Sequence, residues 1–356
     1  MNARRGIAGL AAAAAGTLVA GGVAAALKTR RDVRRRRAES TSRDVFGTLR
    51  SAPVEVVTTD GITLHAEVDE PDETRGRHSA EPTIVFVHGY ALNLDCWHFQ
   101  RAHFRGRHRL VFYDQRSHGR SERSELEHAT IDQLGHDLHS VIEQLAPDGP
   151  VILVGHSMGG MTIMSLADHH PELFGDRVVG VGLVSTTAGG LKTHRVINPY
   201  LPDRVMQQVT PRAMALLARA PGLVDGARRS GSDLGFLVTS KMAFGSDDVP
   251  TPYIEFVDEM LSQTPFEVIA EFFPNFDTLD KWRVLNAFEK VPTVIVCGTE
   301  DVLTSIGHSR KMASRVRGAQ LVEVNGAGHM VILESSEQVN AALERMVEDA
   351  LAEGAA

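Results

Sequence analysis

The sequence predicts an α/β protein in which a mostly parallel, doubly wound sheet carries a helical insertion. Three observations lead to this expectation. Short apolar runs rich in β-branched residues alternate with helical patterns, an arrangement typical of parallel sheets covered by helices on both faces. One run, residues 151–154, stops at Gly155 and enters a helical pattern through a single serine. The alternation is then interrupted between about Thr187 and Asp280, where prolines separate short helical pieces.

Length and composition are those of an ordinary globular protein. The chain has 356 residues, 43% hydrophobic and 23% charged, enough for one large domain with an insertion or for two domains. Cys96 and Cys297 are the only cysteines, so we expect them to fill core space and not to form a disulfide framework or a thiolate metal site. The net charge of −8 combines +8 on residues 1–43 with −16 on the rest. An acidic body argues against a nucleic-acid partner.

The first 43 residues predict a membrane anchor followed by a basic juxtamembrane segment. Gly6 to Leu27 are 22 consecutive uncharged residues, which as a helix would span about 33 Å. Seven Lys or Arg residues follow between Lys28 and Arg37 and would contact anionic lipid. The side richer in basic residues normally stays inside, which places the folded body in the cytoplasm. Two alternatives remain: a cleaved secretory or twin-arginine export signal that uses Arg4-Arg5 with the Ala-rich run, and a peripheral amphiphile.

The strands are predicted in order from apolar runs bounded by turn residues. Residues 54–57 and 62–68 flank Asp60-Gly61, which indicates an antiparallel hairpin. Apolar residues at spacings of three and four after Thr130, a typical N-cap, predict a helix over 131–145 with one buried face. Further buried strands are expected at 83–87, 109–113, 151–154, 178–184, 292–296 and 320–324.

These elements divide the chain into four parts. Residues 1–43 form the anchor and basic segment, 44–186 the first part of the core, 187–281 the insertion, and 282–356 the second part of the core. Between Thr187 and Asp280 lie eight prolines and seven of the fourteen phenylalanines. We expect a helical lid that shapes a substrate pocket, with plain aromatic packing as the alternative.

Ser157 is the candidate nucleophile. It lies in Gly155-His156-Ser157-Met158-Gly159, between a predicted buried strand and a predicted helix. Such a strand–turn–helix lifts the serine oxygen clear of the sheet, and the helix N-terminus beneath it supplies N–H groups and a positive dipole end. The G-x-S-x-G spacing alone is a weak signal, and its structural context makes it specific.

Partners for this serine follow later strands. In a doubly wound sheet, functional groups collect beyond the carboxyl ends of the strands, where Asp301 and His329 both lie. His329 would take the Ser157 proton as general base, while Asp301 would hold the imidazole tautomer. The N–H groups of Met158 and Tyr90 would stabilise an anionic tetrahedral intermediate.

These motifs resemble those of the serine α/β-hydrolases of the monoacylglycerol lipase, esterase and perhydrolase kind. The resemblance covers about Val54 to Leu351 without the insertion, and it implies the α/β-hydrolase fold, the triad and the two oxyanion donors. It favours Asp301 over the neighbouring Glu300, because the spacing from Gly298 matches the family. Ser117 departs from the family's usual glycine, which makes a different loop backbone possible there. The matching stretches are His88 to Tyr90, Asp114 to Ser121, Gly155 to Gly160, Gly298 to Asp301 and Gly328-His329.

Other chemistry-bearing residues are expected to be structural. His88 and His156 flank the site and are expected to brace its loops, while His169-His170 is expected at the surface. The sixteen histidines contain no HExxH or Cys/His metal spacing, and the glycine turns lack a phosphate-loop lysine. We therefore expect neither a metal nor a nucleotide cofactor.

The leading hypothesis is a membrane-tethered serine hydrolase that cleaves a carboxylic ester of a modest-sized apolar acid through an acyl-Ser157 intermediate. The apolar segment at the start of the chain and the Phe-rich insertion suggest a monoacylglycerol or another lipid ester as substrate. A second hypothesis keeps the triad but directs it to thioester, C–C bond or perhydrolytic chemistry. A third is a hydrolase-like body that only binds.

Overall fold

The computed structural model describes residues 46–72, 81–192, 226, 233–246 and 248–354. The predicted anchor and basic segment, residues 1–43, lie outside this part of the chain, so the anchor stays a prediction. Over the residues described, no helix has both the length and the apolar character needed to cross a membrane.

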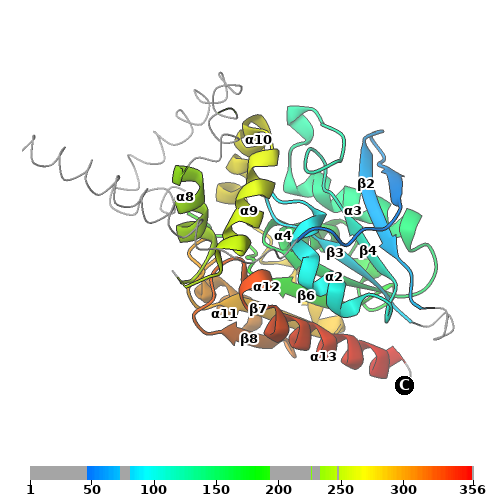
Figure 1. Ribbon diagram of the computed structural model, residues 1–356. Coiled ribbons are helices and arrows are strands. Elements are labelled where there is room, and N and C mark those ends of the chain that lie inside the picture. The colour runs from blue at the N-terminus through cyan, green and yellow to red at the C-terminus, as the bar shows by residue number, and fades with distance from the viewer. Residues whose placement is uncertain (1–45, 73–80, 193–225, 227–232, 247, 355–356) are drawn as a thin grey trace, which may run out of the picture.

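An eight-stranded sheet forms the centre of the molecule (Figure 1), in the order β1-β2-β4-β3-β5-β6-β7-β8. β1 pairs antiparallel with β2 and β2 with β4, and every other pairing is parallel. This confirms the predicted hairpin and the mostly parallel sheet. The strands are β1 Pro53–Val57, β2 Thr63–Asp69, β3 Thr83–Val87, β4 Leu110–Tyr113, β5 Val151–His156, β6 Val178–Val184, β7 Thr293–Gly298 and β8 Gln320–Val324.

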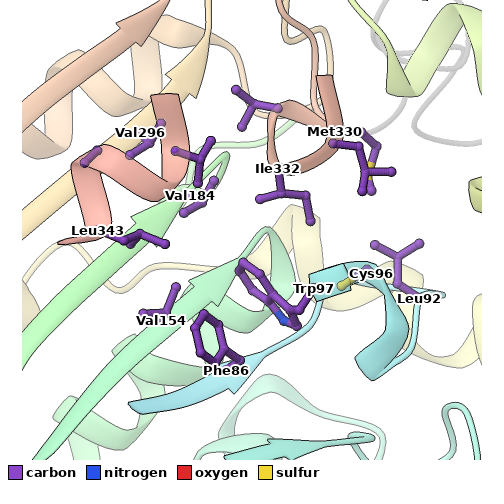
Figure 2. Close-up of a cluster of buried hydrophobic side chains, with 14 of the residues drawn as sticks. Phe86, Leu92, Cys96, Trp97, Val154, Val184, Val296, Met330, Ile332 and Leu343 are labelled. Atoms are coloured by element: carbon purple, nitrogen blue, oxygen red, sulfur yellow. The ribbon is translucent and has the colours of Figure 1, made fainter. Parts of the chain in front are cut away.

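The central strands are apolar on both faces because helices cover both sides of the sheet. In β3 every residue is buried, and successive side chains point to opposite faces. Ile84 and Phe86 join one core cluster, whereas Val85 and Val87 join the other. Figure 2 shows the first cluster, where Phe86 lies beside Trp97 beneath Ile332.

The helices form a layer on each face. The core cluster that contains Val85 receives side chains from α3 Ile131–Leu145, α4 Met158–His169, η5 Val284–Lys290 and α11 Ile306–Ala313. The cluster that contains Phe86 receives η2 Leu94–Trp97, α2 His98–Phe104, α12 Val331–Glu334 and α13 Ser336–Gly354. Thr130 accepts the N–H of Gln133 at 3.1 Å and caps α3, as predicted. The short elements η3 Leu126–His128 and η4 Pro171–Leu173 complete the connections.

Between β6 and β7, the described residues contain three α-helices. They are α8 Asp233–Ala243, α9 Thr251–Gln263 and α10 Phe266–Thr278, and α8 packs beside α9 (Figure 1). The two ends of this segment meet: Gly189 bridges Asp280, and the N–H of Lys281 donates to the carbonyl of Ala188 at 2.7 Å. The chain therefore leaves the sheet and returns to it at one place.

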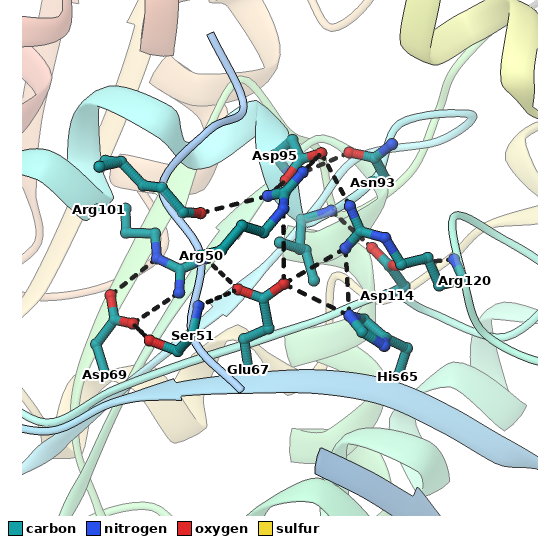
Figure 3. Close-up of polar contacts among 12 residues, drawn as sticks. Arg50, Ser51, His65, Glu67, Asp69, Asn93, Asp95, Arg101, Asp114 and Arg120 are labelled. Atoms are coloured by element: carbon teal, nitrogen blue, oxygen red, sulfur yellow. Dashed lines mark hydrogen bonds and ion pairs between the residues drawn. The ribbon is translucent and has the colours of Figure 1, made fainter. Parts of the chain in front are cut away.

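A buried polar cluster joins α2 to the antiparallel edge of the sheet (Figure 3). Arg101, only 2% exposed, donates to Glu67 at 2.7 Å and to both oxygens of Asp69 at 2.6 and 2.8 Å. Burial raises the pKa of Glu67, but hydrogen bonds from His65, Ser51 and Arg101 outweigh burial and lower it to about 2. Burial also raises the pKa of Asp69, but hydrogen bonds from Arg101 and Ser51 outweigh burial and lower that pKa, so both carboxylates are charged.

Replacing Arg101 by Met should lower the free energy of unfolding by about 3–5 kcal/mol, because Glu67 and Asp69, each 2% exposed, would lose the buried guanidinium that donates to both of them. Chemical denaturation at neutral pH measures the loss. The loss should shrink toward pH 4, because in the variant the buried carboxylates lack Arg101 and take up protons at a higher pH than in the wild type. Arg105→Met is the matched control: Arg105 approaches the same Asp69 at 3.7 Å but its side chain is 38% exposed, so we expect a change below about 1 kcal/mol. Equal losses in the two variants would contradict this account.

Candidate active site

Ser157 occupies the sharp turn between β5 and α4. Its φ of 53° and ψ of −116° lie in a region that residues other than glycine rarely adopt. Glycines make the turn possible: a Cβ at Gly155 would lie 2.5 Å from the carbonyl carbon of Gly159, and a Cβ at Gly159 would lie 2.0 Å from the carbonyl oxygen of Val87. Both outer positions of the G-x-S-x-G pattern therefore need glycine for close packing.

Asp301 and His329 form a buried pair beyond the ends of β7 and β8. His329 Nδ1 lies 2.9 Å from Asp301 Oδ2, which places the proton on Nδ1 and leaves a lone pair on Nε2. Burial raises the pKa of Asp301, but the charge and hydrogen bond of His329 and the hydrogen bonds of Thr304 outweigh burial and hold it well below its usual range. The rival Glu300 is exposed.

The loop after β8, which carries His329, lies against the turn that carries Ser157. His156, which precedes Ser157, has its Nε2 3.0 Å from the His329 carbonyl oxygen, and the two imidazole rings are 4.9 Å apart. Ser157 is 9% exposed and His329 7%. Among the residues described, no hydrogen bond joins the Ser157 hydroxyl to the His329 imidazole. In free enzymes this catalytic hydrogen bond is often long and shortens when substrate binds.

The loop after β3 brings Tyr90 to the same place. A Cβ on Gly89 would lie 2.7 Å from His156 Nδ1 and 3.2 Å from Ser157 Cβ, so the backbone before Tyr90 touches the serine turn. His88 Nδ1 lies 2.8 Å from the Gly89 carbonyl, and its Nε2 accepts the N–H of Gln115 at 2.8 Å. His88 thus ties the loops after β3 and β4 together.

Gly89→Ala should lower kcat/KM at least tenfold and the free energy of unfolding by about 1–3 kcal/mol, since the added methyl group would force the Tyr90 loop and the serine turn apart. Steady-state ester hydrolysis and thermal unfolding check both effects. Gly307→Ala in α11 is the control, because its Cβ would meet no atom closer than 3.7 Å. A Gly89→Ala variant with wild-type activity would show that the close approach is unimportant.

Ser117 adopts a backbone conformation that favours glycine. Its φ is 64°, in the left-handed region that favours glycine, and its hydroxyl accepts the N–H of Ser124 at 3.1 Å. The loop that carries it is held by Asp114, which accepts the N–H groups of Leu94 at 2.8 Å and Arg120 at 2.9 Å. Burial raises the pKa of Asp114 to about 6.

Two residues of the site were missed by sequence reasoning. Thr304 donates its hydroxyl to Asp301 Oδ2 at 2.8 Å and its N–H to Asp301 Oδ1 at 2.8 Å, and its position three residues after the acid was an available signal. Glu334 accepts the N–H of Gly328 at 2.8 Å and of Gly245 at 2.9 Å. No sequence signal pointed to Glu334, since Gly245 belongs to the insertion.

An apolar cluster borders the proposed oxyanion residues. It joins Tyr90 and Met158 to the buried face of α10, which supplies Val268, Phe272 and Phe276. Both cysteines are buried, and burial raises the pKa of the Cys297 thiol to about 12. Within the described ranges, no group of three or more His, Cys, Asp or Glu side chains is arranged to hold a metal ion.

Sheet order, the serine turn after β5, and the acid and histidine beyond β7 and β8 define an α/β-hydrolase fold. The chain belongs to the alpha/beta hydrolase family, whose sequence profile matches residues 84–342. It is a hydrolase by that membership.

Curated and solved relatives agree with this class. Monoacylglycerol lipase ABHD6 of Bos taurus is 24% identical over 263 residues, 73% of either chain. A thermophilic esterase from Thermogutta terrifontis is 22% identical with a TM-score of 0.65 and covers 84% of this chain and 99% of its own. The enol-lactonase from Burkholderia xenovorans LB400 is 24% identical with a TM-score of 0.65 and covers 83% of this chain and 100% of its own. At these identities the structural likeness establishes the fold alone.

Proposed function

We propose that this protein is a serine hydrolase that cleaves carboxylic esters through an acyl-Ser157 intermediate. The observation that carries the proposal is the buried Asp301–His329 pair, 2.9 Å apart, on a loop that contacts the strained serine turn. His329 Nε2 takes the serine proton as Oγ attacks the ester carbonyl, and then returns it to the leaving alcohol. Water repeats the sequence on the acyl-enzyme and releases the acid.

Charge on the tetrahedral intermediate is stabilised by the N–H groups of Met158 and Tyr90. Met158 begins α4, so its N–H has no acceptor within the helix and lies at the positive end of the helix dipole. Tyr90 is brought close by Gly89. Two donors fixed in a buried setting are worth far more than the same donors in water.

An apolar acyl group fits this site best. Met158 belongs to the apolar cluster that also contains Phe272 and Phe276 of α10. The inserted segment, which supplies α10, acts as a lid over the acyl group. The names of the relatives, a monoacylglycerol lipase, an esterase and an enol-lactonase, are those of enzymes that act on esters or lactones, and they support this substrate class.

The test begins with labelling of the purified full-length protein by a fluorescent fluorophosphonate. Hydrolysis of p-nitrophenyl esters from acetate to decanoate, with matched thioesters and peracid formation, then defines the chemistry. We expect Ser157-dependent labelling and the highest kcat/KM on a medium-chain ester. A clear preference for a thioester would move the assignment to a thioesterase. A folded protein that neither labels nor turns over any substrate would be a binding module.

The site would work at a membrane if residues 1–43 anchor the chain. The 22 uncharged residues from Gly6 to Leu27 and the basic cluster behind them support this part of the proposal. Carbonate washing of membranes from cells that express the full-length protein checks it. Release of all the protein by the wash would contradict an integral anchor, and protease accessibility of the body would separate a cytoplasmic location from export.

A further inference from the structure

The proposed oxyanion loop contains a strained residue that is not glycine. Ala91 is 2% exposed and has a φ of 57°. It is the third residue of a turn in which the N–H of Leu92 donates to the carbonyl of Gly89 at 3.3 Å, a position where a positive φ favours glycine or asparagine. An alanine persists in such a conformation only when its surroundings impose it. Tyr90, the proposed donor, directly precedes Ala91.

The sheet holds the two ends of this loop, and the insertion holds its middle. Gly89 packs on the serine turn, and the N–H of Leu94 donates to Asp114 Oδ1 at 2.8 Å. Between these points, hydrogen bonds join the loop to α10 and to the junction of α9 and α10, and the Tyr90 ring also lies beside His118 of the core, with the ring centroids 6.4 Å apart. Thr264 Oγ1 donates to the carbonyl of Ala91 at 2.9 Å, and the Tyr90 hydroxyl donates to the carbonyl of Ile269.

Thr264 is the residue best placed to hold the strained turn. It is 2% exposed and lies between the last residue of α9, Gln263, and the first of α10, Phe266. Its hydroxyl bonds the carbonyl of the strained residue itself and so fixes the orientation of the following peptide group. The contact spans 173 positions in the sequence and joins the insertion to the catalytic core.

We propose that Thr264 is a positioning residue for the oxyanion hole, which makes the junction of α9 and α10 part of the catalytic machinery. This inference rests on the proposed function. Without the hydroxyl, Ala91 would relax toward a more favourable φ and turn the Tyr90 N–H away from the developing oxyanion. The loss would fall on the transition state, where that N–H acts, and spare the bound substrate.

Thr264→Val tests the proposal, because valine keeps the shape and removes the hydroxyl. Complete loss of an oxyanion donor costs about a hundredfold to a thousandfold in kcat, so a misplaced donor should cost at least about tenfold, with KM changed less than about twofold. Thr264→Ser keeps the hydroxyl and should stay within about threefold of wild type. Thr239→Val is the control: Thr239 is also buried in the insertion, but its hydroxyl donates to Asp258, between α8 and α9.

A second readout separates positioning from folding. Phenylboronic acid forms a tetrahedral adduct on the serine, so its inhibition constant should rise with the loss of kcat in Thr264→Val. The inhibition constant of the product acid should not change. The proposal would be overturned if Thr264→Val weakened the binding of both phenylboronic acid and the product acid. It would also be overturned if Thr264→Ser lost kcat to the same extent as Thr264→Val.

Ala91→Gly completes a double-mutant cycle with Thr264→Val, and the result of the cycle does not depend on the stability of a single variant. Glycine takes the left-handed conformation at little cost, so Thr264→Val should lower kcat less in the Ala91→Gly protein than in wild type. Equal losses would contradict the role assigned to Thr264. Failure of this inference leaves Ser157-dependent labelling and hydrolysis intact, whereas a wild-type protein without either would overturn the proposed function and this inference with it.

Discussion

Ser157→Ala should abolish fluorophosphonate labelling and lower kcat about a millionfold, the loss seen when a triad nucleophile is removed. Alanine lacks the oxygen that attacks the carbonyl. The nearby Cys297 thiol does not replace it, because burial raises the pKa of that thiol to about 12. Single-turnover and steady-state hydrolysis of a p-nitrophenyl ester measure the loss.

Ser185→Ala is the matched control for that experiment. Ser185 follows the neighbouring strand β6, is buried, and also has a positive φ, of 44°. Its replacement should leave labelling unchanged, so that only the serine at the turn after β5 matters. Retention of most activity in Ser157→Ala, with a correct mass for the purified protein, would refute the acyl-enzyme mechanism.

Asp301→Asn should lower kcat about ten-thousandfold while the protein stays folded. Asp301 Oδ1 accepts the N–H groups of Leu303 at 2.9 Å and Thr304 at 2.8 Å. The side-chain oxygen of the asparagine would accept these two hydrogen bonds in the same position. The amide nitrogen would then face His329 Nδ1 and donate to it. That contact moves the imidazole proton to Nε2, where the ring no longer accepts the serine proton.

Glu300→Gln provides the comparison for Asp301→Asn. Glu300 is exposed and adjacent in sequence, and its removal should change kcat less than about twofold. Thermal unfolding of both variants shows whether the fold is kept. If Glu300→Gln proved the more damaging of the two, the acid of the triad would be assigned wrongly.

Local sequence patterns were sufficient for the sheet. Each predicted strand is present, with bounds shifted by at most a few residues, because a buried parallel strand needs a short apolar run and its turn needs glycine or a polar break. The serine turn was predictable for the same reason: Gly155 and Gly159 are required by contacts within a few residues and with the neighbouring strand. The insertion was predictable only as a break in the pattern, since no strand separates α8, α9 and α10, the helices described in it.

The sequence by itself determined which side chains follow the strand ends. Because parallel strands place their carboxyl ends at one edge of the sheet, this was enough to predict Ser157, Asp301 and His329 as the candidate catalytic residues. Tertiary structure alone decided the contacts between residues far apart in the chain. It pairs Arg101 with carboxylates more than thirty positions away and sets Thr264 on the strained Ala91. Contacts of this kind depend on how separate elements pack in three dimensions, and neither periodicity nor spacing along the chain carries that information.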